Sequence, residues 1–162
     1  MKAEFLKAMR KLVTPVSIVS TQKDGNKFAI TVSSVTSVSI EPPTLLVCIN
    51  RESSFAGALV DDGLLNINFL NPTQKSIASI CSSREKVKER FSNDQWSIDR
   101  NGNPYLRQSQ SVAFCKVASI FNSHTHLIVI AELQSIIVSD PDKPNPLLYC
   151  NGDYLEISPN PR

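Results

Sequence analysis

Apolar residues recur at helical spacing at the start of the chain and then give way to a two-residue alternation. Within residues 2–12, four apolar side chains share one helical face, and lysine and arginine occupy the other. This spacing predicts a short amphipathic helix that ends before Pro15, because proline cannot continue the helical hydrogen bonding. From residue 16 onward, β-branched residues alternate with polar ones, which is typical of strands.

Strands account for most of the remaining pattern. They are expected at residues 16–21, 28–38, 44–49, 64–70, 112–122, 125–138 and 147–157. The run at 23–26 (KDGN) is a turn signal and predicts a hairpin between the first two strands. Only short helices are expected, at residues 53–59, from Pro72 and at residues 84–91. Many strands with short helices between them favour a mostly antiparallel barrel or sandwich over a parallel βαβ sheet.

Length and charge narrow the class of protein. We expect a single domain over residues 1–162, with a helix at 1–12 and a loose tail at 158–162. Charged residues make up 20% of the chain and the formal net charge is +2, without a basic stripe, so nucleic-acid binding is not expected. The N-terminal residues lack a long apolar core, so we expect no signal peptide, no membrane association and a cytoplasmic location.

The four cysteines lie far apart, at positions 48, 81, 115 and 150, and none forms a CxxC pair. In a chain of this size they are expected to be reduced thiols rather than a disulfide framework. Zinc needs clustered thiolates and imidazoles, and the only histidines are His124 and His126. No metal site is therefore expected.

Familiar catalytic motifs are missing from the sequence. It contains no GxSxG elbow, no Walker loop and no GxGxxG after its first strand, so a nicotinamide cofactor would not be held by a Rossmann fold. Instead, residues 31–37 (TVSSVTS) place hydroxyls on both faces of one predicted strand. Buried hydroxyls need partners. The stretch therefore indicates either a ligand-facing strand or an ordinary edge strand.

Two further polar runs are candidates for chemistry. Residues 50–54 (NRESS) join a strand end to a helix start, where free amides, hydroxyls and Arg51 could hold a phosphate. An ordinary helix cap would have the same composition. Residues 123–126 (SHTH) enter an apolar strand, and their two histidines are either structural or functional. Two such ligands alone do not make a metal site.

Six motifs follow one another in an order that resembles a known family. They are residues 29–38 (AITVSSVTSV), 42–50 (PPTLLVCIN) followed by Ser53 and Ser54, 65–71 (LNINFLN), 89–91 (ERF), 125–133 (THLIVIAEL) and 147–154 (LLYCNGDY). Together they resemble the short-chain flavin reductases of the FMN-binding split-barrel type. The resemblance is greatest to the reductase component of two-component 4-hydroxyphenylacetate 3-monooxygenase.

The resemblance implies a homodimeric, mostly β, antiparallel Greek-key split barrel with a few short helices. It implies an NAD(P)H:flavin oxidoreductase that reduces FMN or FAD by direct hydride transfer and supplies the reduced flavin to a separate oxygenase. Hydride transfer requires that the two rings be positioned correctly and does not require an acid–base pair. This agrees with the sequence, in which no pair of residues stands out as an acid–base couple. The choices of FMN or FAD, and of NADH or NADPH, stay open. The alternatives are a flavin-binding split barrel without turnover and a plain structural barrel.

Site residues also follow from the resemblance. The positions around the flavin ring are Thr31, Val32, Ser33, Ser34, Cys48, Ile49 and Asn50. The positions at the flavin phosphate are Ser53, Ser54 and Arg90, and further cofactor-binding positions are Phe91 and Tyr154. His126 matches the histidine on the nicotinamide side and is the expected catalytic residue. The chain departs from the family pattern at Ala29, where glycine is common, and at His124-Thr125, where Gly-Asp or Gly-Thr is usual.

Overall fold

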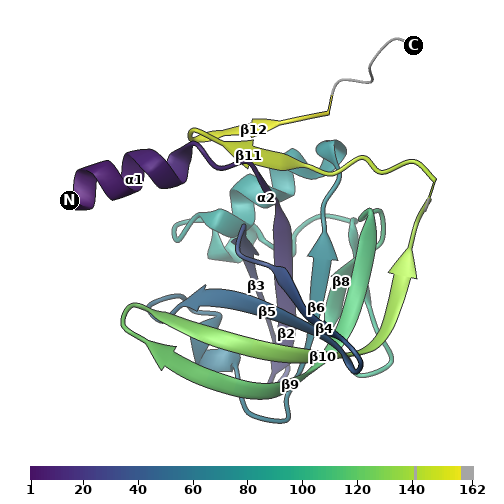
Figure 1. The fold of residues 1–162 in the computed structure, drawn as a ribbon. Helices are drawn as coiled ribbons and strands as arrows, with labels where there is room; N and C mark the ends of the chain where they lie inside the picture. Colours follow the sequence, from purple (N-terminus) through teal and green to yellow (C-terminus); the bar gives the residue numbers. More distant parts are fainter. Residues whose placement is uncertain (141, 158–162) are drawn as a thin grey trace.

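A seven-stranded antiparallel sheet forms the body of the protein in the computed structural model, which describes residues 1–140 and 142–157 (Figure 1). Its strands are β2 (Ser17–Lys23), β3 (Asn26–Val32), β4 (Thr36–Ile40), β5 (Pro43–Asn50), β6 (Leu64–Phe69), β9 (Ser111–Ser123) and β10 (His126–Val138). In space the order is β3-β2-β6-β9-β10-β5-β4, so strands distant in sequence are neighbours. The predicted mostly β, antiparallel fold is confirmed.

Smaller elements surround this sheet. The short strands are β1 (Thr14–Pro15), β7 (Trp96–Ile98), β8 (Pro104–Leu106), β11 (Leu148–Cys150) and β12 (Asp153–Leu155). The helices are α1 (Lys2–Arg10) and α2 (Lys75–Ser82), and the single 3₁₀ turns are η1 (Ala56–Ala58), η2 (Pro72–Gln74) and η3 (Val87–Glu89). Strands β1, β11 and β12 form one small sheet, and β7 pairs with β8.

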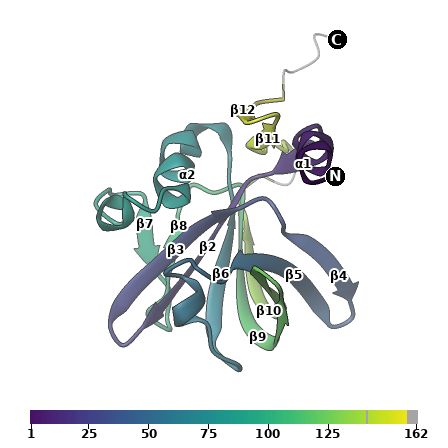
Figure 2. The same ribbon diagram turned by 90° about the vertical axis from the view of Figure 1, so that its left-hand side faces the viewer.

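The two edges of the main sheet, β3 and β4, diverge from each other (Figure 2). Because they do not pair, the barrel is split on this side. Helix α2 packs against β3, and its Ile77, Ala78 and Cys81 are buried there. This split edge, with α2 beside it, provides the framework for the candidate site.

Two apolar clusters fill the interior. The barrel core is built from alternating strand residues such as Val19, Val47 and Ile67, which are fully buried. A second cluster lies between α2 and the outer face of β2, and includes Ile18 and Ile77. The same strand therefore contributes Val19 to one cluster and Ile18 to the other, as the period of two requires.

Asn68 is a fully buried polar residue that joins the β7–β8 hairpin to the barrel. Its Nδ2 donates to the Ile18 carbonyl at 2.9 Å and to Ser20 Oγ at 3.0 Å, and its Oδ1 accepts from the Leu106 amide at 2.7 Å. The hairpin was not predicted, because its strands are three residues long and too short to show alternation.

Several predicted elements differ from the structure. The strand expected at 28–38 is two strands, because the chain leaves β3 after Val32 and resumes as β4 at Thr36. The helices expected at 53–59 and 84–91 are each reduced to one 3₁₀ turn. The strand expected at 147–157 is a hairpin, which Asn151 and Gly152 turn with φ values of 52° and 91°.

The predicted N-terminal helix is present as α1, which projects from the body of the protein (Figure 1) and buries none of its residues. In the ranges 1–140 and 142–157, no helix has the length and hydropathy needed to cross a membrane. The tail predicted at 158–162 lies outside the described residues.

Candidate functional site

Three adjoining cavities form a groove along the split edge of the barrel. The middle cavity, of about 380 Å³, is lined by Ile30, Thr31, Asn50, Glu52, Ser53, Ser54, Cys81, Ser82, Arg84, Val87 and Arg90. It shares Thr31 and Ser82 with a cavity of about 150 Å³ at one end. It shares Ser54, Val87 and Arg90 with a cavity of about 240 Å³ at the other end. We refer to the three together as the groove.

Strand β3 forms one wall of the groove and is held in place by Thr31. The Thr31 hydroxyl donates to the Ala78 carbonyl of α2 at 2.7 Å. Val32 and Ser33 follow it and line the 150 Å³ cavity. Both interpretations of the hydroxyl-rich stretch therefore apply in part: β3 is an edge strand, and it also faces a cavity.

Ser34, Cys48 and Ile49 support this wall without lining any of the three cavities. Ser34 Oγ donates to the Cys48 carbonyl and accepts from the Cys48 amide, both at 3.1 Å. This reciprocal pair joins the chain after β3 to β5 across the split. Ile49 is 1% exposed and belongs to the barrel core.

The turn after β5 forms the opposite wall. Ser53 Oγ donates to the Asn50 carbonyl at 2.6 Å and accepts from the Ala56 amide at 3.2 Å. Its hydroxyl thus caps the turn, as the simpler interpretation of this run predicted. Ser54 is exposed where the 380 and 240 Å³ cavities meet. Arg51 is directed elsewhere, since its Nη1 donates to the His124 carbonyl at 3.3 Å.

Arg90 is a buried cation at the same junction, with 6% of its surface exposed. Its Nη1 donates to the Ala29 carbonyl at 2.6 Å, and its Nη2 donates to the Ser83 carbonyl at 2.8 Å. Its Nε is buried without a hydrogen-bond partner among the described residues. Burial lowers the pKa of Arg90, which nevertheless stays protonated as arginine does in proteins.

Arg84 is a second cation at the groove, and it is exposed. Its Nη2 lies 3.3 Å from Glu52 Oε2, and the two side chains are 69% and 78% exposed. An exposed pair of this kind contributes little to stability, so the guanidinium of Arg84 can exchange Glu52 for an anionic ligand at small cost. The sequence does not single out Arg84, because the mixed charges of residues 84–90 are typical of a solvated helix face.

Aromatic residues occupy both ends of the groove. Tyr154 lines the 150 Å³ cavity, with the Lys75 ammonium 5.8 Å from its ring centroid. Phe91 lines the 240 Å³ cavity, with its ring centroid 4.8 Å from that of Trp96. Both predicted aromatic positions are therefore at the groove, at opposite ends.

His126 lies outside the three cavities, at the first position of β10. It pairs in register with Asn50, which lines the groove. Its side chain is exposed, and its Nδ1 lies 2.9 Å from Thr125 Oγ1. Its neighbour His124 has a φ of 49° and forms part of the turn.

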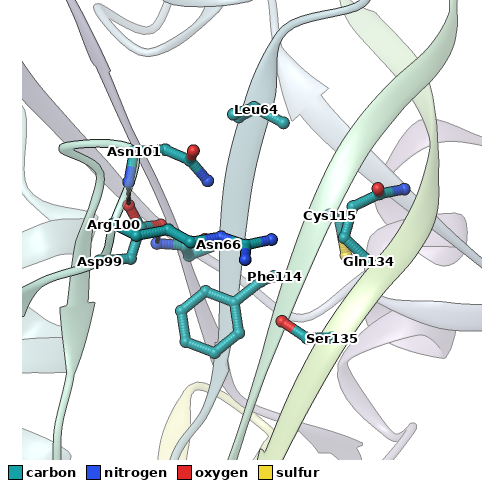
Figure 3. A pocket seen from close by; sticks show the side chains of 9 residues that line it. All are labelled: Leu64, Asn66, Asp99, Arg100, Asn101, Phe114, Cys115, Gln134 and Ser135. Atoms are coloured by element: carbon teal, nitrogen blue, oxygen red, sulfur yellow. Dashed lines mark hydrogen bonds between the residues drawn. The ribbon is translucent and has the colours of Figure 1, made fainter.

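A larger cavity, of about 500 Å³, lies elsewhere on the sheet (Figure 3). It is lined by Leu64, Asn66, Asp99, Arg100, Asn101, Phe114, Cys115, Gln134 and Ser135. None of these was a predicted site residue, and none lines the groove. Size alone therefore does not identify the functional site. The groove is the better candidate because it collects polar groups from four separate segments.

The four cysteines are free thiols, as predicted. Burial raises the pKa of Cys81 to about 12, against the opposing charge of Arg90, and raises the pKa of Cys115 to about 12. We expect iodoacetamide at pH 8 to alkylate Cys48 and Cys150 in the native protein and to spare the other two, because the thiolate is the reactive form. Peptide mass mapping checks this, and rapid labelling of Cys81 would contradict the packing described for α2.

Comparisons with known proteins agree with this architecture. The family model described as "Flavin reductase like domain" matches residues 9–158. The chain is 33% identical over 160 residues to an FMN reductase (NADH), RutF 1, of Methylorubrum extorquens, covering 99% of this chain and 79% of that protein. It is 31% identical over 157 residues to the reductase component of the FADH(2)-dependent resorcinol hydroxylase of a Rhizobium species, covering 96% and 87%.

A solved structure from Haemophilus somnus, described as a candidate flavin reductase, superimposes with a TM-score of 0.89 at 33% identity. The match covers 97% of this chain and 99% of that one. These relatives agree with three expectations from the sequence, namely the split-barrel fold, the oxidoreductase class, and flavin and NADH as cofactors. The chain belongs to the flavin reductase like domain family.

Proposed function

We propose that this protein is a single-domain reductase that uses NADH or NADPH to reduce FMN or FAD in the groove and passes the reduced flavin to a separate oxygenase. The observation that carries the proposal is that Thr31, Asn50, Ser53, Ser54 and Arg90 all line one cavity. These residues come from three distant parts of the chain. The names of the relatives, which include FMN, NADH and FADH(2), support the same chemistry.

The residues at the groove fit a flavin. The walls at Thr31, Val32 and Asn50 would hold the ring, and Ser54 with Arg84 would hold the phosphate. The buried Nε of Arg90, which has no hydrogen-bond partner within the described part of the chain, lies at this phosphate end and adds positive charge. When bound, the flavin supplies an acceptor for a hydride. The chain's own contribution is to position the flavin ring against the nicotinamide ring and to exclude water between the two rings.

Anaerobic mixing tests the activity directly. The protein is mixed with FMN or FAD and with NADH or NADPH, and the visible absorbance of the flavin is followed. We expect bleaching that is much faster than in a mixture without protein. Flavin binding without bleaching would support the alternative of a flavin-binding barrel without turnover. No effect on any flavin with either nucleotide would sink the proposal.

His126 is the proposed residue on the nicotinamide side. Because it pairs with Asn50 but lies outside the cavities, we expect His126→Ala to slow flavin reduction by about tenfold and to leave the flavin Kd unchanged. Stopped-flow reduction and flavin titration measure the two effects. His124→Asn is the matched control, since asparagine tolerates the positive φ at this position. Loss of flavin binding in His126→Ala would instead place the histidine at the flavin.

We also propose a homodimer. Several apolar side chains on the sheet surface are 46–90% exposed, namely Val38, Ile40, Phe121, Ile136, Ile137 and Val138. Exposed apolar surface of this extent is typical of a protein interface. Sedimentation velocity should give twice the monomer mass of 17.9 kDa. A monomer at micromolar concentration would contradict the dimer and leave the reductase proposal standing.

For the recipient of the reduced flavin, we propose a two-component monooxygenase of the 4-hydroxyphenylacetate 3-monooxygenase type. The six ordered motifs support this assignment, and four free thiols are in keeping with the proposed cytoplasmic location. Adding the reductase, NADH and flavin to the purified oxygenase should produce hydroxylated 4-hydroxyphenylacetate. Reduction of flavin without hydroxylation would argue for a different oxygenase.

A further inference from the structure

The 500 Å³ cavity has no part in the proposed flavin site, although it is larger than any cavity of the groove. It is built on β6, β9 and β10 and is bounded by the loop of residues 99–103, which joins β7 to β8 (Figure 3). Leu64 and Asn66 of β6 alternate with Leu65, which belongs to the barrel core, so they face outward. A cavity of this volume can hold a small organic molecule.

Asp99 fixes the loop that carries Arg100 and Asn101. Its Oδ1 accepts from the amides of Asn101 and Asn103 at 2.7 and 3.0 Å, and its Oδ2 accepts from Asn66 Nδ2 at 2.9 Å. The loop also closes on itself, because the Asp99 amide donates to the Asn103 carbonyl at 3.0 Å. Asn66 is 1% exposed, so the amide that holds Asp99 is itself fixed within the sheet. The loop therefore has its conformation before any ligand binds.

Arg100 is the cation of this cavity. It is exposed and takes part in none of the ion pairs found within residues 1–140 and 142–157. Figure 3 shows its guanidinium directed from the loop into the cavity. Both oxygens of the neighbouring Asp99 carboxylate already accept hydrogen bonds. The guanidinium is therefore available to an anionic ligand, to which it can donate two parallel hydrogen bonds.

Gln134 and Ser135 form the wall that faces the loop (Figure 3). The register of β10 against β9 shifts between Leu133 and Ser135, so Gln134 is the extra residue of a β-bulge. Bulges redirect side chains and are common next to functional sites. This bulge places an amide at the cavity, and Ser135 adds a hydroxyl. Both groups can donate to a carboxylate.

The Phe114 ring supplies apolar surface to the same cavity. Phe114 is half-buried, and its ring meets the Tyr105 ring edge to face with the centroids 5.5 Å apart. That contact fixes the ring, which lines the cavity together with Leu64. Aromatic rings attract one another beyond the free energy of burying their area. A flat aromatic ring with one anionic group therefore matches this cavity better than an aliphatic anion or a neutral ring does.

We propose that the 500 Å³ cavity is a second binding site, which takes a small aromatic carboxylate with its carboxylate at Arg100 and its ring against Phe114. The site is separate from the groove, since the two have no lining residue in common. Binding of the carboxylate does not require a flavin. The inference can therefore fail while the proposed function stands, and the reverse.

The test is chemical-shift mapping of the full chain with benzoate as the probe. We expect the amides of Asn101, Gln134 and Ser135 to shift and to saturate at millimolar benzoate, with Thr31 and Ser54 in the groove unaffected. Benzamide has the ring without the charge, and cyclohexanecarboxylate has the charge without the aromatic ring. Each should bind about fivefold more weakly than benzoate.

Arg100→Gln and Phe114→Leu should each raise the Kd of benzoate about fivefold. Arg10→Gln is the matched control, because it removes the same charge from an exposed arginine of α1 that lines none of the four cavities described above. It should leave the Kd unchanged. Equal affinities for benzoate and benzamide, or a native Kd in Arg100→Gln, would overturn the inference. Benzoate shifts confined to the groove, or no shifts at all, would overturn it too, and FMN binding in the groove would be untouched by either result.

Discussion

Replacing Arg90 with alanine is expected to lower the free energy of unfolding by about 3 kcal/mol or more. The guanidinium donates to the Ala29 and Ser83 carbonyls from a position that is 6% exposed, and a hydrogen bond to a charged group contributes about 1.5–3 kcal/mol. In a chain of this length, such a loss lowers Tm by about 6–12 °C. Differential scanning calorimetry of the flavin-free protein measures it.

Arg84→Ala is the control for this change, because Arg84 is 69% exposed and pairs with Glu52, which is also exposed. Its Tm should stay within about 2 °C of the native value. Arg84→Ala should still weaken flavin binding if the groove holds the phosphate. An Arg90→Ala variant with native Tm would mean that the two carbonyls find other partners and that Arg90 has no structural role.

Replacing Ser82 with tryptophan is expected to raise the flavin Kd by more than tenfold without changing stability. Ser82 is exposed at the C-terminal end of α2 and lines both the 380 and the 150 Å³ cavities. Its hydroxyl donates to the Ser79 carbonyl of its own helix. An indole side chain there would occupy the groove, while the core of the protein is left intact.

Fluorescence titration with FMN measures this effect, and circular dichroism reports the stability. Ser76→Trp is the matched control, since Ser76 is an exposed serine on the same helix that lines none of the three cavities. It should bind FMN as the native protein does. Equal loss of binding in both variants would indicate an indirect effect on α2, and native binding in Ser82→Trp would place the flavin outside the groove.

Local pattern predicted most of the strands of the main sheet, because their apolar alternation is long and regular. It failed where strand-forming residues continue across a break between two strands. Residues 28–38 are rich in β-branched residues and contain no glycine, proline, asparagine or aspartate, yet the chain turns away after Val32, and the hydroxyl of Ser34 bonds the backbone of Cys48 fourteen residues later. A contact of that range leaves no trace in local periodicity. The turn at Asn151-Gly152, by contrast, has a local signal, because Asn-Gly is a typical hairpin turn, and it divides the single strand predicted at 147–157.

The candidate site was predictable mainly through the family resemblance. The number of hydroxyl residues in the sequence does not reveal their partners. In the structure the Thr31 hydroxyl donates to the Ala78 carbonyl, and the Ser53 hydroxyl donates to the Asn50 carbonyl. The sequence also does not show that Arg84 and Ser82 face the groove, because both are brought there by the packing of α2 against β3. Ile49 matched a motif but belongs to the core, since alternate residues of a strand point to opposite faces.

Chemical-shift mapping with FMN tests most directly the central claim that flavin binds in the groove rather than in the larger cavity. The amide resonances of ¹⁵N-labelled protein are followed during the titration. We predict shifts at Thr31, Asn50 and Ser54, with Asp99 and Gln134 unaffected. Shifts confined to Asp99, Gln134 and their neighbours around the 500 Å³ cavity would contradict the account.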